Sequence, residues 1–262
     1  MKGALTKEML KTQVNPEQPV LDVVNVTKHF EINGTAKSVL HNITFSAGVG
    51  EMICITGRSG CGKTTLLNIL AGFLKPSAGT VMVNGEPVRK PGPDRCVVFQ
   101  EDTLFPWLTV RENIAFGLKG RTKDKGYVSK EVDRFLSLMG LREFQHYLPR
   151  EISGGMKQRV AIARVFILQP QVLLMDEPFA SLDYHTRREM QDLLVSIWTE
   201  LGQTIIFVTH DLDEAITLAD RIVVMERGSG CIRQELAVPL PRPRKAEQTE
   251  YLFFRRKLYE FL

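Results

Sequence analysis

A glycine-rich run in the N-terminal third of the chain has the residue types and spacing of a phosphate-binding loop. Four residues separate Gly57 from Gly62-Lys63-Thr64, which gives the pattern G-x-x-x-x-G-K-[ST]. An apolar strand pattern precedes the run, and an apolar run suited to a packed helix follows it. In that setting the glycines let backbone N–H groups approach a phosphate closely, and the helix N-terminus attracts the anion.

The side chains of this loop predict specific contacts with a nucleotide. Lys63 can reach the β- and γ-phosphates, and the hydroxyl of Thr64 can ligate Mg²⁺. The residues expected to bind the nucleotide are Gly57, Arg58, Ser59, Gly60, Cys61, Gly62, Lys63, Thr64 and Thr65. The alternative, a glycine-rich turn without a ligand, is disfavoured by the Lys-Thr end and the preceding strand pattern.

Two adjacent carboxylates follow a second apolar strand pattern, residues 172–175. In open α/β sheets, ligands bind outside the carboxyl ends of the strands. We therefore expect Asp176 to hold Mg²⁺, usually through water, and Glu177 to polarise the attacking water as general base. Alone, the pair could be a strand end that meets solvent, but a phosphate loop earlier in the chain favours the catalytic interpretation.

Three further patterns carry little weight when each is taken alone. Ser153 followed by Gly154 and Gly155 predicts a helix start with a serine N-cap and exposed backbone N–H groups. Gln100 is expected at the end of a strand. His210 follows another strand pattern, where a hydrogen-bonded core histidine is the ordinary outcome.

Taken in order, these motifs resemble those of the ATP-binding-cassette (ABC) ATPases, over roughly residues 20–240. The run 152–159 resembles the family's signature motif and precedes the Asp-Glu strand by the family's usual interval. The resemblance implies that the signature residues bind the nucleotide held by the opposite subunit. The signature residues expected at that nucleotide are Ser153, Gly154, Gly155 and Gln158. Arg58 stands where the family more often has Pro, and Thr64 where it more often has Ser, but neither change removes a needed group.

The resemblance also assigns the remaining motifs. Gln100 matches the Q-loop glutamine, which touches Mg²⁺ and the attacking water, and His210 matches the switch histidine at the γ-phosphate. Residues 181–183, which end in Asp183, resemble the D-loop that crosses the dimer interface. Phe30 stands where the family has an aromatic that stacks on adenine, with a core residue at a strand end as the competing interpretation.

The order of elements predicts an α/β fold with an antiparallel β subdomain and a helical insertion. The resemblance implies that its core is a P-loop NTPase core of the ABC ATPase type. We expect an N-terminal tail at 1–18, an ATPase domain at 19–240 with its helical part at about 110–169, and a C-terminal extension at 241–262. The spacing of Tyr251, Phe254, Leu258 and Leu262 predicts a terminal helix docked on its own domain, with a partner site as the alternative. Predicted strands lie at 20–30, 39–46, 52–56, 80–84, 96–100, 172–175, 204–208, 222–226 and 231–238, and predicted helices at 66–73, 111–118, 129–139, 153–168, 186–201 and 212–219.

Composition narrows the class of protein. The 262-residue chain has a formal net charge of +4 and no dense basic stripe, which argues against a nucleic-acid partner. Its four cysteines form no C-x-x-C pair, so neither a zinc site nor a disulfide framework is expected. The sequence contains no run of 18 apolar residues, so we expect no membrane span. Residues 1–10 contain no continuous apolar stretch typical of a signal peptide.

A narrower resemblance, carried by residues 90–110 and 175–194, is to the nitrate/sulfonate/taurine group of importers. It implies an ATPase subunit that uses ATP and Mg²⁺ to power uptake of a small anion or small organic nutrient. The implied partners are a second ATPase subunit, two membrane permease subunits and an extracytoplasmic substrate-binding protein, with the chain peripheral to the cytoplasmic face of the inner (plasma) membrane. The loop 101–108 would line the permease groove, unless its aromatic residues fold back into the chain.

Two alternatives differ in class from this importer subunit. One is a soluble ABC ATPase without a transport role, but the chain has neither the long coiled-coil insertion of repair members nor the two fused cassettes of translation members. The other, a P-loop kinase or GTPase, leaves the signature motif unexplained.

Overall fold

A computed structural model of the chain describes residues 19–32, 34–100 and 103–262. The strands are β1 (Leu21–Ile32), β2 (Thr35–Ala47), β3 (Met52–Thr56), β4 (Ala78–Val83), β5 (Glu86–Pro87), β6 (Arg95–Val98), β7 (Val172–Asp176), β8 (Thr204–Val208), β9 (Arg221–Met225) and β10 (Ile232–Ala237). The α-helices are α1 (Lys63–Ala71), α2 (Val110–Phe116), α3 (Lys125–Leu138), α4 (Gly154–Phe166), α5 (Tyr184–Leu201), α6 (Leu212–Leu218) and α7 (Thr249–Tyr259). Two short 3₁₀ turns, η1 (Arg142–Phe144) and η2 (Pro149–Glu151), connect α3 to α4.

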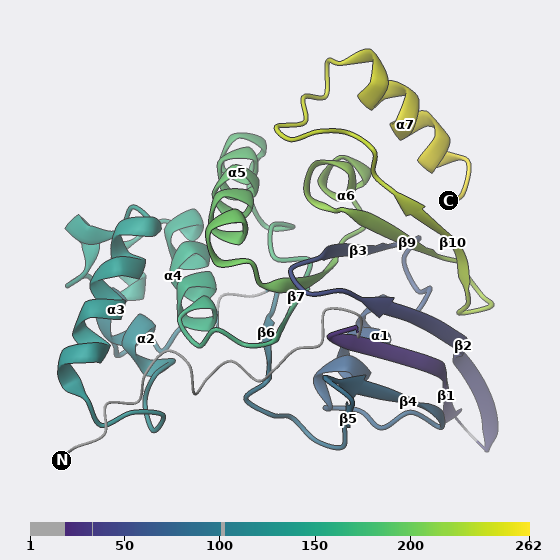
Figure 1. Cartoon of the computed structure of the whole chain (residues 1–262), viewed down its shortest axis with the longest axis horizontal. Coiled ribbons are helices and arrows are strands. Elements are labelled where there is room, and N and C mark those ends of the chain that lie inside the picture. The colour runs from purple at the N-terminus through teal and green to yellow at the C-terminus, as the bar shows by residue number, and fades with distance from the viewer. Residues whose placement is uncertain (1–18, 33, 101–102) are drawn as a thin grey trace.

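Two sheets organise the molecule (Figure 1). The first is antiparallel, with strand order β2-β1-β4-β5, as the sequence predicts. The second has the order β10-β9-β3-β8-β7-β6, in which β10 pairs antiparallel with β9 and the other neighbours run parallel. The α/β class with an antiparallel subdomain is therefore confirmed.

The parallel sheet is buried on both faces. Along β3, Ile53 and Ile55 belong to one hydrophobic cluster, which also contains α1 and the antiparallel sheet. Met52 and Cys54 belong to the second cluster, which extends into α4, α6 and α7. Because side chains alternate across a strand, a strand covered on both faces is apolar along most of its length, as β3 is from Met52 to Ile55.

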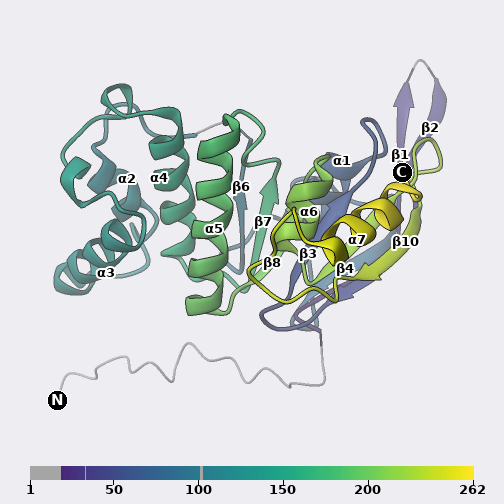
Figure 2. The same cartoon turned by 90° about the horizontal axis from the view of Figure 1, so that it is seen from above.

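The helical segment 110–166 lies at one end of the molecule, where α2, α3 and α4 group together away from α1 and the antiparallel sheet in both views (Figures 1 and 2). Two helices begin earlier than the apolar pattern indicates. α1 starts at Lys63 because Gly62, at φ 102°, ends the loop in a left-handed conformation. α3 starts at Lys125 because the side chain of Asp124 accepts hydrogen bonds from the N–H groups of Gly126 and Tyr127.

The C-terminal segment packs on the core through α7. Tyr251, Phe254 and Leu258 are buried, and Leu262 is partly buried, as their helical spacing predicts for a docked helix. The opposite face of α7 exposes Phe253 at 72%. Within the described ranges, none of the helices combines the length and apolar character needed to cross a bilayer.

Candidate nucleotide-binding and hydrolysis site

The phosphate loop connects β3 to α1, and its glycines are required by close packing. A Cβ atom at Gly62 would lie 2.7 Å from Leu40 Cδ2 and 3.0 Å from the carbonyl oxygen of Val39. A Cβ atom at Gly57 would lie 2.6 Å from the carbonyl oxygen of Met225. These distances exclude a larger residue at either position, so the backbone of the loop can approach both its neighbours and an anion.

Lys63 is buried at the start of α1, and its Nζ donates a hydrogen bond to the carbonyl oxygen of Gly57 at 2.8 Å. The amine thus lies over its own loop, where it faces the mouth of a cavity of about 470 Å³. The cavity is lined by Val39, Ser59, Gly60, Gly62, Lys63, Thr64, Thr65, Glu177 and His210. Backbone N–H groups, one ammonium group and two hydroxyl-bearing threonines form a suitable cradle for the phosphates of a nucleotide.

The cavity combines segments that are far apart in the sequence. Glu177 follows β7, His210 follows β8, and these strands are neighbours in the parallel sheet. Val39 lies within β2 and was not predicted as a site residue. The sequence around Val39 is that of an ordinary strand and gives no sign of a binding site. Val39 lines the cavity because β2 packs beside Gly62.

Glu177 and His210 are directly hydrogen-bonded, with 2.9 Å between Glu177 Oε2 and His210 Nδ1. The Glu177 side chain is 21% exposed and that of His210 is 62% exposed, so water can reach both. Glu177 has φ 44°, a left-handed conformation that costs a non-glycine residue about 1–2 kcal/mol. Its N–H donates to the carbonyl oxygen of Val208 at 2.9 Å, which holds this strained residue against the end of β8.

Asp176, the last residue of β7, lies beside the loop. Burial raises the pKa of its carboxyl group, Glu177 raises the pKa further, and a hydrogen bond with Thr64 and the charge of Lys63 oppose the rise. Among the described residues, no group of three or more His, Cys, Asp or Glu side chains is arranged to hold a metal ion alone. One carboxylate and one hydroxyl beside a phosphate cradle fit Mg²⁺, which usually takes few protein ligands and completes its shell with phosphates and water.

The signature residues lie at the start of α4. Ser153 caps the helix by accepting a hydrogen bond from the N–H of Met156 at 3.3 Å, and both Ser153 and Gly154 are exposed. Gln158 differs from its neighbours, because it is only 4% exposed and faces the inside of the chain. None of these residues lines the nucleotide cavity of their own chain as far as the structure describes it.

Three other predicted site residues, Gln100, Asp183 and Phe30, do not line this cavity. Gln100 is exposed two residues after β6, whose last residue, Val98, pairs with Met175 of β7. Asp183 is exposed and caps α5, and hydrogen bonds from Thr186 lower the pKa of its carboxyl group.

Phe30 is partly buried in β1, with Lys28 Nζ 5.1 Å from its ring centroid. Because Phe30 is only partly buried, part of the residue is exposed to solvent. Stacking of Phe30 on adenine stays a prediction.

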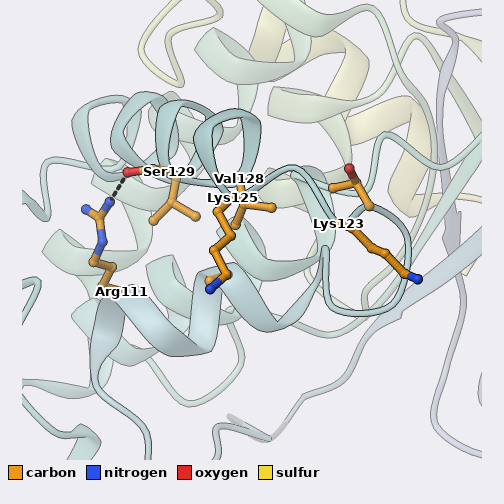
Figure 3. Close-up of a pocket in the computed structure, with 8 residues that line it drawn as sticks. Arg111, Lys123, Lys125, Val128 and Ser129 are labelled. Atoms are coloured by element: carbon orange, nitrogen blue, oxygen red, sulfur yellow. Dashed lines mark hydrogen bonds between the residues drawn. The ribbon is translucent and has the colours of Figure 1, made fainter. Parts of the chain in front are cut away.

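A second hollow of about 240 Å³ lies between α2 and α3 (Figure 3). Three cationic side chains line it, but Lys123 and Lys125 point apart, and Arg111 is already bonded to Ser129 and paired with Asp133. Because the charges do not converge, this hollow is a poor candidate for an anion site.

Comparison with known proteins identifies the family. The ABC transporter family model matches residues 40–180. The chain belongs to the ABC transporter ATPase family. It is 45% identical over 233 residues to the nitrate import ATP-binding protein NrtD of Synechococcus elongatus, covering 85% of this chain and 84% of that protein. It is 42% identical over 251 residues to the bicarbonate transport ATP-binding protein CmpD of the same species, covering 93% and 90%.

Solved structures agree with this assignment. A dimeric ATP-binding cassette, MJ0796, in a post-hydrolysis state bound to ADP and Pi, superposes with a TM-score of 0.73 at 29% identity, covering 84% of this chain and 100% of that one. The present chain is therefore an ATP-hydrolysing subunit of an ABC importer, and the soluble alternative without a transport role is not favoured.

Proposed function

We propose that this subunit hydrolyses ATP at two sites shared between paired ATPase chains and thereby powers import of a small anion of the nitrate or bicarbonate class. The observation that supports the catalytic part is the Glu177–His210 hydrogen bond at the mouth of the phosphate-loop cavity. The substrate class rests on the importers NrtD and CmpD, which the chain matches over most of its length.

The proposal assigns a role in ATP binding or hydrolysis to each polar group of the site. Lys63 and the backbone of the loop bind the phosphates, and Glu177 Oε1 or Oε2 accepts a proton from the attacking water. His210 orients the Glu177 carboxylate and faces the γ-phosphate. Gln100, two residues after β6, helps to hold the water. When bound, Mg²⁺ would neutralise charge on the phosphates, and Asp176 and Thr64 are the residues that would hold it.

Asp176→Asn is expected to remove the Mg²⁺-dependent part of ATP binding. The amide keeps the shape of the side chain but is a much weaker ligand for a hard cation, so ATPase activity should fall about 100-fold or more. Binding of a fluorescent ATP analogue, titrated with and without Mg²⁺, measures the effect. Asp192→Asn, an exposed carboxylate on α5, is the control. Undiminished Mg²⁺ dependence in Asp176→Asn would place the metal elsewhere.

The proposed permease contact is the aromatic surface formed by Phe105, Trp107 and Phe116. The ring centroid of Phe105 lies 4.3 Å from that of Phe116 and 5.7 Å from that of Trp107. Trp107 is 71% exposed, whereas Phe105 is partly buried. Exposed aromatic residues in a fixed loop are typical anchors of protein interfaces.

Asn113 of α2 fixes the loop that carries this surface. Its Oδ1 accepts a hydrogen bond from the Phe105 N–H at 2.9 Å. Its Nδ2, which carries two hydrogens, lies within hydrogen-bond distance of the carbonyl oxygens of Phe105, Leu108 and Thr109. Since Asn113 is fully buried, the loop is held rigidly and Trp107 is presented outward. Residues 101–102, which join this loop to Gln100, lie outside the described residues.

Trp107→Ala should weaken assembly with the permease about tenfold or more, since it removes an exposed anchor, while ATPase activity and melting temperature of the free subunit stay unchanged. The test is co-purification with co-expressed permease subunits, followed by uptake of labelled nitrate and labelled bicarbonate. Phe253→Ala removes an aromatic of equal exposure on α7 and is the matched control.

The two measurements separate the two parts of the proposal. Normal assembly of a stable Trp107→Ala subunit would refute the contact. Uptake of neither anion by the unmodified complex would refute the substrate class while leaving the contact intact.

A further inference from the structure

The C-terminal extension holds the first turn of α6, the helix that follows His210. The hydroxyl of Tyr251 lies 3.1 Å from both the carbonyl oxygen and Oδ1 of Asp213. Arg255 Nε donates to the same Oδ1 at 2.9 Å. Two side chains of α7 therefore meet on one residue of α6, three positions after His210.

The extension also holds the last turn of α6. Arg244 is buried and donates to the carbonyl oxygens of Ile216 and Ala219, the first at 2.6 Å. Arg242 donates to the carbonyl oxygen of Leu218 and pairs with Asp220 at 2.7 Å. Carbonyl groups at a helix C-terminus lack hydrogen-bond donors within the helix. The guanidinium groups of Arg242 and Arg244 supply these donors at the end of α6.

α6 depends on such contacts because it has only seven residues. A helix of this length is not stable by itself in water, so its position is set by the elements packed against it. In Figure 1 the extension passes from β10 across α6 and continues into α7 beside it.

The first turn of α6 is bonded rigidly to the residues on both sides of His210. Asp211 caps the helix by accepting hydrogen bonds from the N–H groups of Asp213 and Glu214. Thr209 Oγ1 donates to Glu214 Oε2 at 2.7 Å, and both side chains are buried. A shift of α6 would therefore carry the backbone of His210 with it.

We propose that Tyr251 and Arg255 are positioning residues for hydrolysis. They hold α6 through Asp213, and α6 holds His210 within hydrogen-bond distance of Glu177. The extension thereby sets the geometry of the His210–Glu177 pair without contacting the nucleotide cavity. This inference rests on the role proposed above for His210.

The test compares Tyr251→Phe, Arg255→Gln and the double variant in the full-length protein. We expect the double variant to lower kcat about tenfold, because a small displacement of a catalytic group is costly. KM for ATP and the affinity for a fluorescent ATP analogue should change less than about twofold, since the phosphate loop does not move. Tyr251→Phe combined with Arg255→Lys keeps a positive charge opposite Asp213 and should recover most of the kcat that the double variant loses. Arg256→Gln, an exposed arginine next to Arg255, is the matched control.

The outcomes distinguish this inference from the function on which it rests. Wild-type kcat in the double variant, with His210→Ala inactive, would overturn the inference alone. A fall in kcat accompanied by equal losses in ATP affinity and melting temperature would also overturn it, because that pattern marks a general structural defect. Wild-type turnover in His210→Ala would overturn the role of His210, and the inference with it. A selective fall in kcat that Arg255→Lys rescues supports the inference.

Discussion

Glu177→Gln should lower steady-state ATP hydrolysis about 10²- to 10⁴-fold, the contribution typical of a positioned general base, while leaving ATP binding nearly unchanged. The amide has the shape of the carboxylate and can keep a hydrogen bond to His210, but it cannot accept a proton from water. The strained backbone of Glu177 and the 2.9 Å contact with His210 both indicate a side chain fixed in place for one task.

The loss of hydrolysis should also reveal the dimer. With ATP bound and not consumed, paired chains stay closed, so the variant should elute as a dimer with ATP and as a monomer without it. Phosphate release and elution volume measure the two effects. Glu86→Gln, an exposed glutamate on β5, should behave as the unmodified protein. Near-normal phosphate release by Glu177→Gln would assign the base to another residue.

The parts of this site that lie at strand ends could be predicted from the sequence. β3 and β8 have the predicted bounds, because a strand buried on both faces is a short, uninterrupted apolar run that ends where the polar residues begin. Asp176, Glu177 and His210 follow such runs, so their common position at the carboxyl edge of the sheet follows from the fold class.

Contacts between distant segments could not be predicted. Val39 lines the nucleotide cavity because the antiparallel sheet packs beside Gly62. The local sequence of β2 does not predict that contact. The same holds for Arg244, whose sequence context is a proline-rich link, although its guanidinium group closes the last turn of α6. Gln158 belongs to a motif expected at a nucleotide, yet the helix period turns its side chain inward.

The start of α4 gives the strongest test of a site shared between two chains. Gly154 has open space around the position of an added Cβ atom, whereas a Cβ atom at Gly155 would lie 2.6 Å from Thr186 Cγ2 within the same chain. A substitution at Gly155 therefore strains its own chain, and Gly154 is the cleaner choice. Gly154→Asp adds a negative charge that a helix N-terminus tolerates well, but that would face the phosphates of the partner's nucleotide.

Lys63→Ala chains and Gly154→Asp chains should each be nearly inactive alone and regain activity when mixed. Lys63→Ala removes the ammonium group that faces the phosphates, and Gly154→Asp repels them from across the interface. In the mixed dimer, one of the two sites joins an intact loop to an intact signature. Equal mixing makes half of the dimers mixed with half of their sites intact, so about a quarter of wild-type activity is the upper limit when the sites act independently.

Crosslinking decides the geometry even where coupling between the sites suppresses the regained activity. A chain that carries introduced cysteines at both Ser59 and Ser153 should become linked to its partner chain with ATP present and not without it. The four native cysteines are buried or partly buried, and the chain without introduced cysteines gives the background. In a single chain, α4 lies with the helical group and α1 beside the β-sheets in both views (Figures 1 and 2), so linkage between chains is the arrangement that the fold favours. Linkage confined to single chains would mean that each chain completes its own site, and the shared-site proposal would be wrong.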